Sequence, residues 1–329
     1  MTFRNKFPPL ILLLGGASIA TIAAAILRKK YRKTTTRRTV DDEIKNGKLV
    51  VESIGKIESI YRLCVGTPRQ GLLAPHARGR LRLNYAHAVE GLSEYSYVWI
   101  VFVFHLNTPH KGVKIAPPAL GGRKVGVLAT RSPHRFNPVG ITLARLDKII
   151  IAENNSVSLE LSGLDLVDGT PVLDIKPYVA AYDSPIDEVA RVPSWVSGGL
   201  ATKRPVELSD TARDSLRRIL KEGKTKFYGR SFGESDDEGF EHLAACICEV
   251  LAMDVRSTYQ TKKVREGKSQ AERSKRVQIK VTEQSFACTQ QIDNLLVHFS
   301  VQPASSVVRP TSEGSGAEDT VFVTKIEPL

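Results

Sequence analysis

The sequence predicts a mainly β chain: a β-barrel domain, a smaller α+β C-terminal subdomain after it, and a single transmembrane helix before it. The first observation is a series of about seven short apolar, β-branched segments between residues 48 and 178, joined by short connections, which is typical of a closed or nearly closed barrel. The second is that the helical spacing of apolar residues begins only after residue 207. The third is an uncharged run at residues 7–27.

Residues 1–47 are predicted to form a membrane anchor and a basic linker. The uncharged run at 7–27 is long enough to span a bilayer core of ~30 Å. Seven basic residues follow it at 28–38, whereas only Arg4 and Lys6 precede it. The positive-inside rule therefore predicts a single-pass anchor in a membrane, with the rest of the chain facing the cytosol. Organelle targeting is the alternative, because arginine, threonine and no acids precede Asp41.

The charge distribution and the cysteine positions bear on two classes, nucleic-acid-binding proteins and metal-binding proteins. The net charge is +12, but nine basic residues and no acid lie in 1–38, so the remaining residues carry only +3. That charge does not by itself indicate nucleic-acid binding, which would require clustering. Cys246 and Cys248 lie in an apolar helical pattern, and no nearby pair of ligands completes a four-ligand metal site. The sequence predicts reduced thiols and no metal.

The barrel domain is predicted over residues 48–184. Strands are expected to start at 48–54 and to continue at 79–85, 97–106, 142–152 and 157–162. Polar and apolar residues alternate in 79–85, which indicates a half-buried strand. The 97–106 segment is almost unbroken in apolar residues, so it should be buried on both faces or line the barrel core.

Two polar runs interrupt this pattern. Residues 126–142 begin as a strand, become a turn rich in arginine, histidine, asparagine and proline, and end as a strand from Gly140. Residues 164–178 contain a tight turn at 168–171, followed by a strand with Val172, Asp174 and Lys176 on one face. Polar loops held between strands often carry function, although a rigid hairpin and a capped turn would have the same composition.

The rest of the chain divides by composition into a linker at 185–206, an α+β subdomain at 207–302 and a flexible tail at 303–329. In the subdomain, 209–222 is expected to be an amphipathic helix that buries Leu216, Ile219 and Leu220, and 241–253 a second helix. Residues 277–281 and 294–301 are expected to pair as strands. Residues 262–280 carry a net charge of +6, which indicates either a solvated face or a phosphate-contacting segment.

Several separated motifs, in one order, resemble a known family. They are residues 54–61, Pro68-Arg69-Gln70, residues 91–105 and both polar runs, with weaker traces at 249–259 and 295–301. The chain resembles the TsaA-like (TrmO-type) family, whose members are S-adenosylmethionine-dependent methyltransferases acting on N6 of threonylcarbamoyladenosine at position 37 of tRNA. The resemblance implies a homodimeric enzyme whose cofactor is S-adenosyl-L-methionine and whose partner is the tRNA anticodon loop carrying threonylcarbamoyladenosine.

The resemblance and the chemistry of the donor together suggest roles for individual residues. The expected cofactor-binding residues are Pro68, Arg69, Gln70, His105, Leu106, Arg131, Ile141, Ser162, Gly163, Leu164 and Asp165. Asp168 or Asp174 is the expected proton acceptor, with Lys176 and Tyr178 orienting it. The expected RNA contacts are Arg135, Asn137, Lys111, Lys114 and Arg123, with Arg78, Arg80 and the 262–280 run as further candidates.

Two departures from the family pattern keep other functions open. Leu106 stands where the family commonly has glutamine, and Asp254-Val255-Arg256 stands where it has Asp-Pro-Arg. No glycine-rich GxGxxG motif follows a strand, so the dinucleotide-type cradle of Rossmann methyltransferases is absent from the sequence. The alternatives are a small-molecule methyltransferase on the same barrel and a non-catalytic, membrane-tethered RNA-binding barrel.

Overall fold

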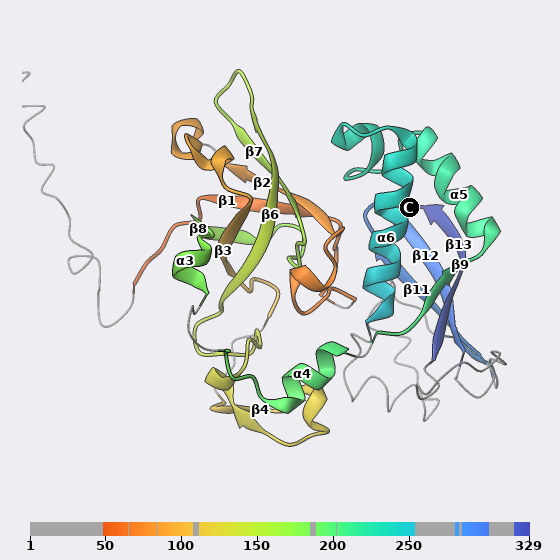
Figure 1. The fold of residues 1–329 in the computed structure, drawn as a ribbon, viewed down its shortest axis with the longest axis horizontal. Coiled ribbons are helices and arrows are strands. Elements are labelled where there is room, and N and C mark those ends of the chain that lie inside the picture. Colours follow the sequence, from red (N-terminus) through yellow and green to blue (C-terminus); the bar gives the residue numbers. More distant parts are fainter. Residues whose placement is uncertain are drawn as a thin grey trace, which may run out of the picture. The chain divides into compact units, whose positions relative to one another are not determined.

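Six strands close into an antiparallel barrel in the order β1-β2-β7-β6-β3-β8 (Figure 1). This is a computed structural model, and it describes residues 49–64, 66–83, 85–107, 112–184, 189–201, 203–253, 280–282, 285–302 and 319–329. The barrel strands are β1 (Gly55–Ser59), β2 (Arg78–Leu83), β3 (Tyr97–Val103), β6 (Val139–Ile151), β7 (Val157–Ser162) and β8 (Pro171–Pro177). The predicted barrel is confirmed.

The strand directions place the functional loops at one end of the barrel. Because every neighbouring pair is antiparallel, β1, β3 and β7 run in the same direction. The segments that follow them, 60–77, 104–138 and 163–170, therefore leave the barrel at the same end, which we call the loop end. Both polar runs of the sequence begin or pass there.

Inward-facing apolar residues of the barrel strands form the core. Val98, Ile100 and Phe102 of β3 are buried inward, as are Leu159 and Leu161 of β7. The prediction for β8 is wrong at Val172, which was placed on the polar face but is fully buried. The register shifts there, because Asp174 lies opposite Val101 while Val172 lies opposite Phe102. This bulge at Leu173 returns Val172 to the core side.

The long connection at 104–138 carries its own small sheet. In it, β4 (Lys114–Ile115) pairs with β5 (Val125–Gly126). The strand expected through Val127 and Leu128 is instead a 3-10 turn, η5 (Val127–Ala129). Other short turns are η1 (Gly71–Leu73), η2 (Ala86–Val89), η3 (Leu92–Glu94) and η4 (Pro118–Leu120), and α3 (Ala180–Asp183) follows β8.

A five-stranded sheet and two helices form the C-terminal subdomain. The sheet order is β10 (Lys280–Thr282), β11 (Ser285–Ile292), β12 (Leu295–Gln302), β13 (Thr320–Pro328), β9 (Val206–Leu208). Two predictions are wrong here. Residues 320–328 of the expected tail form an inner strand, because Val321, Val323 and Ile326 are buried apolar residues. The strand at residue 280 pairs with β11, not with 294–301.

Both expected helices are present. In α5 (Asp210–Lys221), the Ser209 hydroxyl accepts the Ala212 N–H, and Leu216, Ile219 and Leu220 are buried as predicted. The second helix, α6 (Asp236–Ala252), starts earlier than residue 241, because Ser235 and Glu238 form a capping box. The expected linker also contains a helix, α4 (Ser194–Ala201).

Several predictions lie outside the described residues: the anchor at 7–27, Lys111, most of the 262–280 run, residues 254–256 and the first part of the tail. In the part of the chain that the structure describes, no helix combines the length and apolar character needed to cross a bilayer. That part also holds no group of three or more His, Cys, Asp or Glu side chains arranged for a metal ion. None of the four cysteines forms a disulfide.

Candidate functional site

Three segments far apart in sequence meet at the loop end of the barrel. The Arg131 guanidinium, from the 104–138 connection, donates a hydrogen bond to Gln70 Oε1, from the segment after β1. Its charge also acts on Asp165, in the segment after β7. The structure thus brings together Gln70, Arg131 and Asp165, all of which the sequence had suggested for one site.

Two glycines let the first and third segments touch. A β-carbon on Gly71 would lie 1.8 Å from the carbonyl oxygen of Gly163, so no other residue fits there without movement. Gly163 has φ +66°, in the left-handed region that favours glycine. The Gly71 N–H also hydrogen-bonds Asp165. Gly71 was not among the predicted site residues, although it directly follows Gln70 in the sequence.

Gly71→Ala is expected to displace the 60–77 segment from the 163–170 segment and to destabilise the fold by about 1–3 kcal/mol, the usual cost of overpacking. Urea denaturation would measure this loss. Gly126→Ala is the matched control, because Gly126 has φ −58° and a β-carbon there would meet nothing within 4 Å. Equal stability of the two variants would contradict the close approach.

Asp165 is the most perturbed carboxyl group at the loop end. The residue is partly exposed, but its Oδ1 is buried and has no hydrogen-bond partner among the described residues. Burial raises the pKa of Asp165 to about 6, against the opposing effects of the Thr142 hydroxyl, the Arg131 charge and the Gly71 N–H. Thr142 lies on β6 and is itself buried. A cationic group placed at Oδ1 would satisfy this carboxylate.

Both carboxylate oxygens of Asp168 are engaged by the protein. One carboxylate oxygen accepts the Ser59 N–H at 3.0 Å, and the other accepts the Arg62 guanidinium at 2.7 Å. Both contacts tie the turn before β8 to the end of β1. His105, at the end of β3, lies beside this turn, since its Nε2 is 3.9 Å from where a β-carbon on Gly169 would be. Leu106 next to it is exposed.

Asp174, Lys176 and Tyr178 follow the outward side of β8. Asp174 lies opposite Val101 of β3, which in turn lies opposite Ile141 of β6, so these three residues form one row across the barrel wall. The Asp174 carboxylate pairs with Lys176 Nζ at 2.7 Å. Tyr178 contacts the rings of Tyr97 and Trp99. At ~3.3 Å per residue, Tyr178 lies roughly 23 Å along the strand from Pro171, toward the opposite end of the barrel.

The other expected cofactor residues of the first and third segments differ in burial and in contacts. Pro68 is buried and Arg69 exposed. The Ser162 hydroxyl donates to Asp147 Oδ1 at 3.1 Å. Leu164 belongs to the barrel core, and its N–H donates to the Ala77 carbonyl at 3.1 Å.

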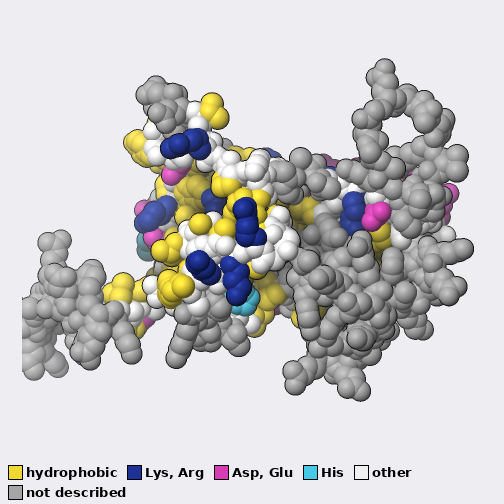
Figure 2. All heavy atoms as spheres, turned by 90° about the horizontal axis from the view of Figure 1, so that it is seen from below, with side chains coloured by type: hydrophobic (Ala, Val, Ile, Leu, Met, Phe, Trp, Pro, Cys, Tyr) yellow, Lys and Arg dark blue, Asp and Glu magenta, His cyan; other side chains and the backbone are white. Residues whose placement is uncertain are grey.

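Basic and apolar side chains lie together on the face around the 104–138 connection. Arg135 donates to the Thr130 carbonyl at 3.0 Å, which orders the loop that carries Arg131. Lys114 and Arg123 are exposed, as is Asn137. Figure 2, seen from the side on which β4 lies in Figure 1, shows Lys and Arg side chains among hydrophobic ones. Exposed Leu128 and Phe136 belong to this connection.

Arg78 and Arg80, the further candidates for RNA contact, are both engaged by groups of this chain. Arg78 pairs with Glu234 at 2.6 Å, and its side chain is only 11% exposed. Arg80 pairs with Glu160 at 3.2 Å and donates to the Ser231 carbonyl. The alternation along 79–85 correctly placed Arg80 on the polar face of the strand, but the C-terminal subdomain covers that part of the face.

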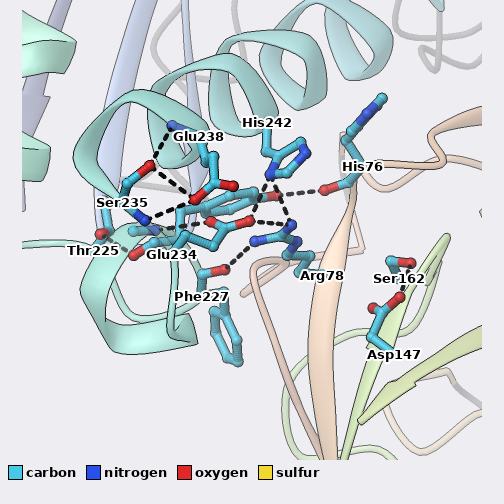
Figure 3. A network of polar contacts seen from close by, with 12 residues as sticks. His76, Arg78, Asp147, Ser162, Thr225, Phe227, Glu234, Ser235, Glu238 and His242 are labelled. Carbon is cyan, nitrogen blue, oxygen red and sulfur yellow. Dashed lines mark hydrogen bonds and ion pairs between the residues drawn. The ribbon is translucent and has the colours of Figure 1, made fainter.

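This covered face contains a polar network that sequence reasoning missed. Arg78 projects from β2 toward Glu234 and His242, and His76 stacks on His242 with ring centroids 5.6 Å apart (Figure 3). His76 also pairs with Glu249 at 2.6 Å. No local signal marks partners that are more than 150 residues away. The network fixes the start of β2, next to the segment that carries Gln70 and Gly71.

The fold and site define an antiparallel barrel protein in which loops from three segments converge at one end. Residues 56–184 match the family model of the tRNA-methyltransferase O N-terminal domain. The tRNA (adenine(37)-N6)-methyltransferase of Escherichia coli K12 is 38% identical over 215 residues, which cover 63% of this chain and 82% of that protein. The chain belongs to this family, the TrmO family.

Other relatives extend the comparison. The mouse tRNA (adenine(37)-N6)-methyltransferase is 48% identical over 213 residues, covering 60% of this chain and 48% of that protein. The chain therefore spans about half the length of that curated relative, and 41% of the human one. The crystal structure of TrmO from Pseudomonas aeruginosa superposes with a TM-score of 0.52 at 28% identity, covering 85% of this chain and 98% of that chain.

Proposed function

We propose that this protein transfers a methyl group from S-adenosyl-L-methionine to N6 of adenine 37 in tRNA, and that the adenosine already carries the threonylcarbamoyl group. The observation that carries the proposal is the convergence of Gln70, Arg131 and Asp165 from three segments at one end of the barrel. The names of the relatives support the tRNA substrate. The threonylcarbamoyl group is supported by the family resemblance.

The residues at the loop end fit the proposed cofactor. S-adenosylmethionine supplies an activated methyl group on a sulfonium, and it also carries an ammonium, a carboxylate and an adenine. The buried, unpartnered Oδ1 of Asp165 suits a cationic group of this donor. Arg131 suits its carboxylate. Backbone groups at Ile141 and 162–164 are our candidates for holding the adenine edge. The chain contributes orientation, the main requirement of an in-line displacement.

The nucleophile requires a proton acceptor, because N6 of a urea-like adenosine is a weak nucleophile. Of the two carboxylates suggested by the sequence, Asp168 has both oxygens engaged by Ser59 and Arg62, whereas Asp174 is half-exposed and paired only with Lys176 among the described residues. We therefore favour Asp174 as the acceptor. Arg135 or Lys176 would meet the carboxylate of the threonyl group.

Asp174→Asn is expected to lower kcat by a factor of about 10²–10⁴, the usual contribution of general base catalysis, without weakening donor binding. Single-turnover methylation with saturating donor would measure this. Asp168→Asn is the comparison, because loss of its contacts should lower the unfolding free energy first. Wild-type turnover in Asp174→Asn would show that the base lies elsewhere.

Mass spectrometry of tRNA nucleosides from a strain lacking the protein tests the proposed function. Loss of the methylated threonylcarbamoyladenosine, restored by the wild-type gene, is the expected result. Unchanged methylation would reject the tRNA substrate. Calorimetry with S-adenosylmethionine then separates the alternatives: donor binding favours a small-molecule methyltransferase, and its absence favours a non-catalytic RNA-binding barrel.

Two further parts of the proposal concern assembly and location. We propose a homodimer, supported by the apolar outward face of β3 and β6, on which Val139 and Ile141 are 41% and 46% exposed. A monomeric mass in sedimentation velocity would reject it.

We also propose that residues 7–27 anchor the chain in a membrane, with organelle targeting as the alternative. Imaging the full chain beside one starting at Arg38 tests this, since identical distributions would exclude an anchor.

A further inference from the structure

A hollow lies on the barrel wall, away from the loop end. Its volume is about 260 Å³, and it is lined by outward residues of three neighbouring strands and by residues 231–233, at the end of the turn η6 (Gly229–Phe232). Two cross-strand rows form its floor: Lys148 opposite Glu160 opposite Arg80, and Ile150 opposite Ser158 opposite Arg82. None of the proposed catalytic or donor-binding residues lines this hollow.

The hollow carries an excess of positive charge. Among the described residues, Glu160 is the single acid that lines it, and Arg80 pairs with that carboxylate at 3.2 Å while donating to the Ser231 carbonyl. Arg82, whose side chain is 52% exposed, pairs with Glu58 at 3.3 Å. Lys148 is exposed and has no ion pair to the residues that the structure describes. An anion would therefore meet net positive charge.

Ser158 provides an independent reason to expect a ligand. The residue is 5% exposed, it lines the hollow, and its hydroxyl has no hydrogen-bond partner in the described part of the chain. An unpaired buried hydroxyl is costly unless a partner supplies an acceptor. The alternating residues Val157 and Leu159 face the barrel core, so an apolar residue at 158 would not disturb that core. A hydroxyl donor flanked by Arg82 and Lys148 has the chemistry of an oxyanion site.

We propose that this hollow binds a phosphate of the RNA backbone and so holds the tRNA at a second point, an inference that rests on the proposed function. Ser158 is four residues along β7 from Ser162, at the loop end, or roughly 13 Å at ~3.3 Å per residue. That distance is short enough for both sites to contact the same RNA. A base at the donor site and a phosphate in the hollow can therefore belong to one bound RNA.

Ser158→Ala is the decisive variant, because it removes the orphan hydroxyl without removing a charge or a contact within the protein. We expect the Tm to stay the same or rise, while KM for tRNA rises about tenfold and the effect on kcat is small. The salt dependence of binding should not change, since no cation is lost. An unchanged KM for tRNA, or a lowered Tm, would overturn the assignment of this hydroxyl to a ligand.

Lys148→Gln tests the charge, with Lys221→Gln, an exposed residue of α5, as the matched control. In filter binding with tRNA, Lys148→Gln is expected to weaken affinity and to reduce the slope of log K against log salt by about 1. Lys221→Gln should leave both unchanged. Equal slopes for the two variants would contradict a phosphate contact at Lys148.

Two measurements distinguish failure of this proposal from failure of the proposed function. If wild-type protein binds tRNA but does not methylate it, the proposed function fails, while the slope difference between the Lys148 and Lys221 variants still tests the hollow. Inorganic phosphate is the second probe. Competition by millimolar phosphate that is lost in Ser158→Ala, together with weaker tRNA binding, supports the proposal. Phosphate binding without any effect of the variants on tRNA would overturn it.

Discussion

Asp165→Asn is expected to abolish donor binding while making the folded chain more stable at neutral pH. The wild-type carboxyl is buried with one oxygen unpaired, and its pKa is raised from 3.8 to about 6. The asparagine side chain cannot ionise, so it avoids the cost of a buried charge. It also cannot supply the negative charge that a cationic donor needs, and we expect at least a 100-fold loss of affinity in calorimetry.

The pH dependence of stability follows from the direction of this pKa difference. A carboxyl whose pKa is higher in the folded state than in the unfolded state stabilises the fold fully only below the unfolded value of 3.8. That stabilisation is lost as the pH rises to about 6, and the loss amounts to at most ~3 kcal/mol. Urea denaturation between pH 4 and pH 8 should show the unfolding free energy of Asp165→Asn increasing relative to that of the wild type as the pH rises.

Donor affinity should change in the opposite direction with pH. Only the ionised carboxylate attracts a cation, so wild-type affinity should fall below pH ~6 and level off above it. Asp214→Asn is the control, because Asp214 is 79% exposed on α5 and is remote in the fold from the loop end. Wild-type donor affinity in Asp165→Asn would remove Asp165 from the site.

Arg78→Ala is expected to destabilise the fold by about 3–5 kcal/mol, the usual cost of leaving one partner of a buried ion pair alone. Arg78 contacts Glu234 and His242 (Figure 3). Its guanidinium also lies over the rings of Tyr228 and Phe232, at 5.1 and 4.7 Å from their centroids. Burial opposes ionisation of Glu234, yet the Arg78 guanidinium lowers the pKa of that carboxyl overall. Without Arg78 the carboxylate loses its main partner.

The effect should reach the donor site. Arg78 begins β2, and the carbonyl of its neighbour Ala77 accepts the Leu164 N–H, directly before Asp165. We therefore expect weaker donor binding in Arg78→Ala even at temperatures where it remains folded. The double variant Arg78→Met with Glu234→Gln, which removes both charges, should recover most of the stability. If the double variant does not recover stability, the contacts of Arg78 with the rings of Tyr228 and Phe232 contribute more to stability than the ion pair does.

The wild-type ion pair should also weaken in acid. Because the pKa of Glu234 is lowered on folding, its stabilisation is present above the unfolded value of 4.5 and is lost as the pH falls below it. The difference in unfolding free energy between Arg78→Ala and the wild type should therefore be largest near neutral pH and smallest in acid.

The sequence by itself determined the local features of this protein. Alternation predicted β2, a nearly unbroken apolar run predicted β3, an apolar, β-branched segment predicted β7, and helical spacing predicted α5 and most of α6. Separated motifs indicated the family before any fold was known. These signals are local because they depend on which face of one strand or helix is apolar. Even the early start of α6 was readable from Ser235 and Glu238, which form its capping box.

Only the tertiary structure decided which distant segments meet and which surfaces are covered. The contact of Gln70 with Arg131, and the close approach of Gly71 to Gly163, follow from barrel closure. Arg80 was correctly placed on the polar face of its strand, but a second subdomain covers it. The bulge at Leu173 and the inner position of β13 also depend on partner strands. Periodicity reports the face of an element, whereas its neighbour determines whether that face meets water, protein or ligand.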